Sequence, residues 1–137
     1  MKVVLDTNIF VAAGFNARSH SAAILTAIRN GNLTLVWNAE VRAETRAILN
    51  RIPKLSWAVV ADLFAPEGEY GGPTCPECYG QIVDPDDRKF AALAAATGAT
   101  LVSNDVHLLA VRDRLDVPVR TPREVIFTDQ GRLSSRA

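Results

Sequence analysis

Four acidic residues stand where a carboxylate could take part in chemistry: Asp6, Glu44, Asp87 and Asp105. Asp6 follows a short Val-rich apolar run, Asp105 stands just past a later apolar run, and Asp87 opens a helical pattern. In open α/β sheets the ligand crevice lies beyond the carboxyl ends of the strands. Helices that follow strands begin at that same edge, so we expect these three aspartates to gather there.

Glu44 needs a separate argument, because it lies inside a predicted helix. At about 100° per residue, it falls at the border of the apolar face that Val41 and Ile48 help to form. It lies one turn after Val41 and one turn before Ile48. The pattern therefore lets Glu44 point along the protein body toward the crevice.

Converging carboxylates raise one another's pKa unless a cation lies among them. Magnesium and manganese prefer oxygen ligands and keep several waters when only a few carboxylates hold them. Such an ion can activate water, orient a phosphodiester and stabilise the leaving oxygen. Because the set has no His or Cys ligand, it favours phosphoryl transfer over zinc chemistry.

The elements that would position these residues alternate between strands and helices. Apolar, β-branched runs predict strands over residues 2–5, 33–37, 100–103 and 117–120. Helical periodicity predicts helices over residues 19–30, 38–51, 55–64, 87–97 and 106–115, with a further short helix after residue 121. This alternation indicates an α/β fold, a three-layer α/β/α arrangement around a mostly parallel central sheet.

Local signals mark where several of these helices begin and end. Ser19 or Ser21 can cap the first predicted helix, and Asn38 is a plausible N-cap for the helix that carries Glu44. Gly14 is expected to break the apolar segment after Asp6. Residues 121–124, Thr-Pro-Arg-Glu, predict a capping box with proline at the first helical position.

The bulk composition predicts one globular domain, residues 1–130, followed by a short C-terminal tail, residues 131–137. Fifteen basic residues balance fifteen acidic ones. The absence of a basic excess argues against a protein that simply coats nucleic acid, but not against an enzyme whose carboxylates offset its arginines. No apolar run approaches the roughly 20 residues of a membrane span, so we expect no membrane partner and a cytoplasmic location.

Two cysteines, Cys75 and Cys78, form a CPEC unit inside a Gly- and Pro-rich segment, residues 65–80, that predicts a long loop. In a cytosolic chain the expected state is a reduced pair, since a disulfide is not needed to explain it. The spacing is also half of a zinc-ribbon pattern. A zinc ion shared between two subunits is therefore an alternative.

The segments that carry the acidic residues, taken together with the closing turn, resemble the PIN domain family. Val-Leu-Asp-Thr-Asn, residues 4–8, resembles its opening motif, and the segments over residues 38–49, 84–94 and 101–105 resemble its later acidic motifs. Residues 121–124 resemble its closing Thr-Pro-x-Glu turn. The segments follow the family's order and span nearly the whole chain, and their closest subgroup is the VapC-like toxins of bacterial toxin–antitoxin pairs.

This resemblance implies Mg²⁺- or Mn²⁺-dependent cleavage of single-stranded RNA, an antitoxin partner and a homodimer. It gives the acidic metal-site roles to Asp6, Glu44, Asp87 and Asp105. It makes Thr7 and Asn8 supporting residues and Ser103 an orienting hydroxyl. Candidate arginines for a rim that guides RNA are Arg18, Arg42, Arg46, Arg88, Arg112 and Arg114.

Several alternatives stay open. Asp84 could replace Asp87, and His107 stands where many relatives carry a further acid. The same site could serve RNA processing or DNA cleavage, or the domain could be a catalytically weak module that binds nucleic acid. A phosphatase with an Asp-x-Asp nucleophile pair is disfavoured, because Asn8 occupies the second position.

Overall fold

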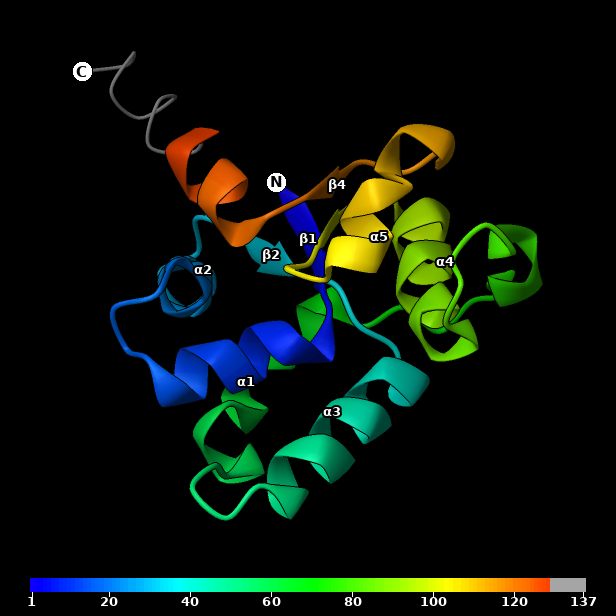
Figure 1. Ribbon diagram of the computed structural model, residues 1–137. Helices are drawn as coiled ribbons and strands as arrows, with labels where there is room; N and C mark the ends of the chain where they lie inside the picture. The colour runs from blue at the N-terminus through cyan, green and yellow to red at the C-terminus, as the bar shows by residue number, and fades with distance from the viewer. Residues whose placement is uncertain (129–137) are drawn as a thin grey trace.

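The computed structural model describes residues 1–128, and its centre is a four-stranded parallel sheet (Figure 1). The strand order is β2-β1-β3-β4. The strands are β1 (Lys2–Leu5), β2 (Thr34–Leu35), β3 (Thr100–Val102) and β4 (Val119–Arg120). Because β1 and β3 are adjacent, with Leu5 opposite Val102, the residues that follow them emerge at the same edge. The predicted parallel sheet is confirmed.

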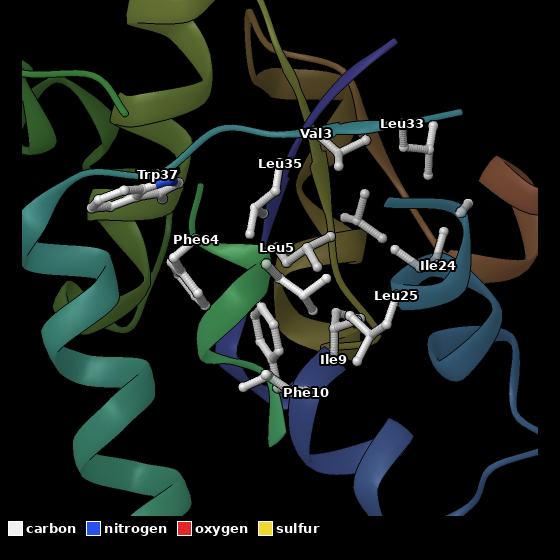
Figure 2. Packing of buried hydrophobic residues seen from close by; sticks show 14 of the residues in the cluster. Val3, Leu5, Ile9, Phe10, Ile24, Leu25, Leu33, Leu35, Trp37 and Phe64 are labelled. Atoms are coloured by element: carbon white, nitrogen blue, oxygen red, sulfur yellow. The ribbon is translucent and has the colours of Figure 1, made fainter. Parts of the chain in front are cut away.

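Helices cover both faces of the sheet, which makes three layers. Strand β1 alternates its side chains, so Val3 and Leu5 belong to one apolar cluster and Val4 to the other. The first cluster packs against α1 (Thr7–Phe15) and α2 (His20–Arg29), as Figure 2 shows. The second packs against α4 (Arg88–Thr97) and α5 (Val106–Ala110). The expected α/β/α architecture is confirmed.

Helix α3 (Ala39–Arg51) begins and ends as the sequence predicts. The Asn38 side chain accepts a hydrogen bond from the Val41 amide, at 2.9 Å, so it is the N-cap. Ser19, not Ser21, caps α2. Thr121 and Glu124 form the predicted capping box before the helical residues 122–128, since each side chain accepts from the other's backbone amide.

Two sequence expectations were wrong. Gly14 does not break the chain but lies inside α1, where an added Cβ would stand 2.5 Å from Leu55 Cδ2. The predicted helix over residues 55–64 is two short 3₁₀ turns, Trp57–Val59 and Ala61–Leu63. The segment over residues 65–80 is a loop, as the sequence predicts, and it contains two further 3₁₀ turns, Pro66–Gly68 and Pro76–Tyr79.

The described part of the chain contains no helix that is both long and apolar enough to cross a membrane. The predicted boundary between the domain and its tail, at residue 130, lies outside the described residues.

Candidate metal centre

Asp6 is the most deeply buried of the four acidic residues, with only 4% of its surface exposed. It joins β1 to α1, and its carboxylate caps the helix by accepting from the Asn8 amide at 3.2 Å. The other carboxylate oxygen accepts from the Ser103 hydroxyl at 2.8 Å. Ser103 follows β3, so the parallel pairing of β1 and β3 brings these two residues together across 97 positions.

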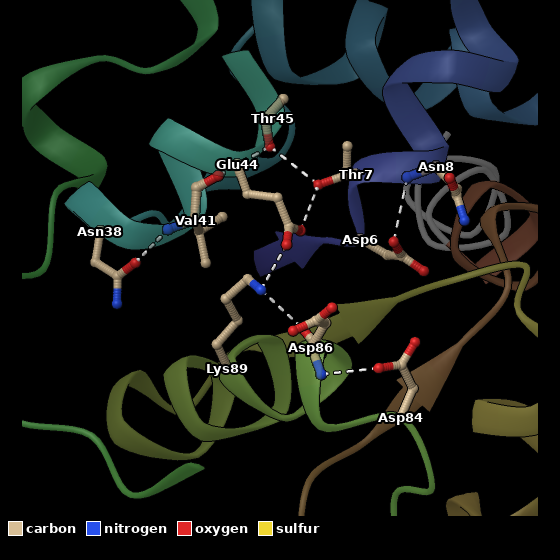
Figure 3. A network of polar contacts seen from close by, with 10 residues as sticks. All are labelled: Asp6, Thr7, Asn8, Asn38, Val41, Glu44, Thr45, Asp84, Asp86 and Lys89. Atoms are coloured by element: carbon tan, nitrogen blue, oxygen red, sulfur yellow. Dashed lines mark hydrogen bonds and ion pairs between the residues drawn. The ribbon is translucent and has the colours of Figure 1, made fainter. Parts of the chain in front are cut away.

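Glu44 reaches the same edge from α3. Its Oε2 atom accepts from the Thr7 hydroxyl at 3.2 Å, and its Oε1 atom lies 2.6 Å from the Lys89 ammonium (Figure 3). The Thr7 hydroxyl also lies 3.2 Å from the hydroxyl of Thr45, which is completely buried. The side chain of Glu44 is 26% exposed, which agrees with its predicted place at the border of the apolar face.

Asp87 and Asp105 line one small hollow of about 150 Å³, together with Asp84 and His107. Asp87 closes the 3₁₀ turn Pro85–Asp87 and immediately precedes α4. Asp105 caps α5, where its Oδ1 atom accepts from the His107 amide at 2.8 Å. The Asp105 amide in turn donates to the Ser103 hydroxyl at 3.0 Å, so Ser103 links the hollow to Asp6.

The charges of these carboxylates act on one another. Burial raises the pKa of Asp6, and the charges of Asp105 and Glu44 raise it further against the hydrogen bonds from Ser103 and Asn8. Burial, followed by the charges of Asp6, Asp84, Asp105 and Glu44, raises the pKa of Asp87 to about 6. A cation placed among these carboxylates would favour the ionised forms of Asp6 and Asp87.

The chemistry of this donor set fits a hard divalent ion, because every side chain offers oxygen. Among residues 1–128, no group of three or more His, Cys, Asp or Glu side chains is placed so that it could already hold a metal ion. Mg²⁺ is commonly held by one or two carboxylates with waters completing its coordination, so an open arrangement suits it. The residues that would hold the ion are Asp6, Asp87 and Asp105, with Glu44 beside them.

The predicted supporting residues contribute in different ways. The hydroxyls of Ser103 and Thr7 donate hydrogen bonds to the carboxylates of Asp6 and Glu44. Asn8 donates its backbone amide to Asp6, and the residue itself is exposed. Sequence reasoning missed Lys89 and Thr45. Thr45 had a weak signal, because it lies on the apolar face of its helix, but nothing in the pattern around Lys89 indicates its contact with Glu44.

The cysteine expectation was wrong. Cys75 and Cys78 form a disulfide, because the 3₁₀ turn that contains Cys78 brings their Cα atoms to 5.4 Å. This leaves neither a reduced pair nor two zinc ligands. The disulfide borders a hollow against the later part of α4, at Ala95 and Ala96, beyond the residues of that helix that contact the acidic site.

The candidate rim arginines have varied surroundings. The Arg42 guanidinium lies 5.2 Å from the centre of the Trp57 ring, and Arg88 Nε donates to the Ile82 carbonyl. Arg112 forms an ion pair with Glu124 at 2.8 Å. Three others are exposed: Arg18, Arg46 and Arg114.

The chain thus has a parallel three-layer α/β/α fold with acidic side chains at the carboxyl edge of its sheet. The PIN domain family model matches residues 2–107, which include all four acidic positions. The chain therefore belongs to the PIN domain family. A comparison with curated protein sequences gives no match.

Solved structures share this fold at low sequence identity. A chain of VapBC2 from Rickettsia felis, bound to a DNA fragment from its promoter, is 21% identical with a TM-score of 0.60; the match covers 88% of this chain and 98% of that one. A chain of FitAB bound to IR36 DNA is 19% identical, with a TM-score of 0.57 and coverages of 88% and 94%. A chain of FitAcB from Neisseria gonorrhoeae is 19% identical, with a TM-score of 0.56 and coverages of 88% and 97%.

Proposed function

We propose that this PIN domain is a Mg²⁺- or Mn²⁺-dependent endoribonuclease that cleaves single-stranded RNA in the cytoplasm. The observation that carries the proposal is the meeting of Asp6, Glu44, Asp87 and Asp105 from four separate segments at one edge of the sheet. When bound, the divalent ion would supply Lewis-acid activation of the phosphodiester and of the attacking water. Family membership supports a nuclease rather than a phosphatase.

The chain's own residues hold the site for that reaction. Ser103 and the Asn8 amide fix both oxygens of Asp6, and Ser103 also fixes the backbone at Asp105. The His107 amide holds Oδ1 of Asp105, which leaves Oδ2 without a hydrogen-bond donor from residues 1–128. Fixed carboxylates of this kind lower the reorganisation needed when an ion and a phosphate arrive.

We also propose that the enzyme is the toxin of a toxin–antitoxin pair, inhibited by an antitoxin protein and active as a homodimer. The similar folds of the VapBC2 and FitAB chains support the toxin role, and the homodimer is what the resemblance to VapC-like toxins implies. Expression in a bacterial host is then expected to arrest growth. A variant that lacks the nuclease activity is expected to leave growth normal.

The test is cleavage of labelled single-stranded RNA with Mn²⁺ or Mg²⁺, beside duplex DNA and a small phosphomonoester. Asp105→Asn is the informative variant, because asparagine also caps helices well and the change mainly removes charge. Asp113→Asn, at an exposed residue, is the matched control. RNA cleavage that EDTA and Asp105→Asn abolish, but Asp113→Asn does not, supports the proposal. Cleavage of DNA alone, or intact RNA with every metal and a folded protein, contradicts it.

A further inference from the structure

Lys89 places a positive charge inside the acidic site. Its side chain is only 12% exposed, and its ammonium lies 2.6 Å from Glu44 Oε1 and 2.7 Å from the Asp86 carbonyl oxygen (Figure 3). The ammonium also stands 5.4 Å from the centre of the neighbouring Phe90 ring. Two strong contacts and low exposure fix this charge, unlike that of an ordinary surface lysine.

Both oxygens of Glu44 are occupied by side chains of the protein. Lys89 holds one oxygen and the Thr7 hydroxyl donates to the other. An ion that used Glu44 as a ligand would therefore lie close to this ammonium, and it would be repelled by the ammonium on approach.

The three aspartates Asp6, Asp87 and Asp105 differ from Glu44 in their contacts with basic side chains. Among residues 1–128, neither Asp6, Asp87 nor Asp105 forms an ion pair with a basic side chain. Asp6 and Asp105 accept hydrogen bonds from hydroxyl and amide groups, which orient a carboxylate without cancelling its charge. The uncompensated negative charge thus lies on the three aspartates and not on Glu44.

From this geometry we infer that Lys89 is a positioning residue that neutralises Glu44 and takes the place of a second cation, so that the site binds a single divalent ion at Asp6, Asp87 and Asp105. This inference rests on the proposed metal-dependent function. Two-metal phosphodiesterases place their ions roughly 3.5–4 Å apart, and here the carboxylate that a second ion would need, that of Glu44, already holds a fixed ammonium. Glu44 then orients Lys89 and Thr7 and does not ligate the metal.

Binding of Mn²⁺ alone, measured by calorimetry, tests the inference without using activity. The wild-type chain is expected to bind one Mn²⁺, and Lys89→Met to bind two, because Glu44 becomes available. Lys89→Arg is expected to restore one ion, and Lys54→Met, at an exposed lysine, to leave the stoichiometry unchanged. Asp87→Asn is expected to weaken binding by about 100-fold, as the loss of a close charge partner does. Glu44→Gln is expected to weaken it by no more than about threefold, since Lys89 already neutralises that charge.

A measurement in EDTA covers the case in which Lys89→Met alone is too unstable to study. Lys89→Met is expected to shift the unfolding equilibrium toward the unfolded state by about tenfold, because it leaves Glu44 without its cation among other carboxylates. The double variant Glu44→Gln/Lys89→Met is expected to recover part of that loss and still bind one Mn²⁺. Additive effects of the two changes would contradict the ion pair.

The outcomes separate the inference from the proposed function. Two ions on the wild-type chain, or equal losses from Glu44→Gln and Asp87→Asn, overturn the role of Lys89 and leave a metal-dependent nuclease standing. No Mn²⁺ on a folded wild-type chain overturns both.

Discussion

Asp6 and Glu44 meet at the same edge of the sheet, yet the protein holds them in different ways. Asp6 is buried, and among residues 1–128 its carboxylate accepts hydrogen bonds from neutral donors, the Ser103 hydroxyl and the Asn8 amide. Glu44 is partly exposed and is paired with the Lys89 ammonium. Neutral donors orient a charge and leave it available, whereas an ammonium cancels it. A carboxylate can therefore serve as an ion ligand at Asp6 and as the partner of a structural ion pair at Glu44.

The largest effect is expected from removing the charge of Asp6, the carboxylate that neutral donors hold. Asp6→Asn is expected to lower the rate of RNA cleavage by about 10³-fold, since the ion's contribution amounts to several kcal/mol. The rate is measured on labelled single-stranded RNA in Mn²⁺. Asp62→Asn is the control, because Asp62 is exposed and pairs with Arg29 far from the site. A folded Asp6→Asn protein with an undiminished rate would show that Asp6 is only a helix cap.

A second pair of variants compares the hydroxyl that contacts Asp6 with the hydroxyl that contacts Glu44. Ser103→Ala removes a donor from Asp6, and Thr7→Val removes one from Glu44, which keeps Lys89. We expect Ser103→Ala to lower Mn²⁺ affinity by about 10-fold or more, as the loss of residues that support metal ligands does. Thr7→Val is expected to change it by about threefold at most. Larger losses from Thr7→Val, measured by calorimetry, would reverse the assigned roles.

The pH dependence of stability gives a smaller effect. The pKa of Asp87 is raised from 3.8 to about 6 in the folded protein, so ionisation opposes folding. Its contribution is therefore favourable below pH 3.8 and is lost as the pH rises through about 6. In EDTA, Asp87→Asn is expected to be as stable as the wild type near pH 4 and more stable at pH 7 by about 1 kcal/mol, a value reduced for partial exposure.

Denaturant unfolding at the two pH values measures this difference, and saturating Mn²⁺ is expected to reverse its sign at pH 7 because the ion binds the wild-type site more tightly. A stability gap that is the same at both pH values would contradict the raised pKa of Asp87.

The smallest effect on the site is expected from the disulfide. Replacing Cys75 and Cys78 by serine removes a cross-link over a short loop, which costs about 2 kcal/mol of stability in the chain-entropy treatment. Mn²⁺ affinity and RNA cleavage are expected to change by less than about twofold, because the disulfide packs against the later part of α4. A large loss of RNA cleavage by a folded variant would contradict this prediction and show that the disulfide loop affects the acidic site.

The sequence allowed much of the fold to be predicted, because its signals are local. Alternating strands and helices, the Asn38 cap and the residue 121–124 capping box all depend on neighbours within a few positions. Gly14 was misread for a physical reason, since its role is to admit Leu55, a residue distant in the chain. The three aspartates could be expected at one edge from the alternation of strands and helices, whereas Glu44 required a separate argument from the apolar face of its helix.

The charge balance of the site could not be predicted. Lys89 follows Asp87 by two positions, and in the sequence it is an ordinary helical lysine, but its partner Glu44 lies on another helix. That contact depends on how α3 and α4 approach each other. The disulfide was missed because the 3₁₀ turn that closes it has no regular pattern.

The most direct test of the whole account is a crystal structure of the wild-type protein grown with Mn²⁺, with the ion located by its anomalous scattering. We predict one Mn²⁺ between Asp6, Asp87 and Asp105, with the Glu44–Lys89 pair intact beside it. An ion ligated by Glu44 with Lys89 displaced, or no ion at the carboxyl edge of the sheet, would contradict the account.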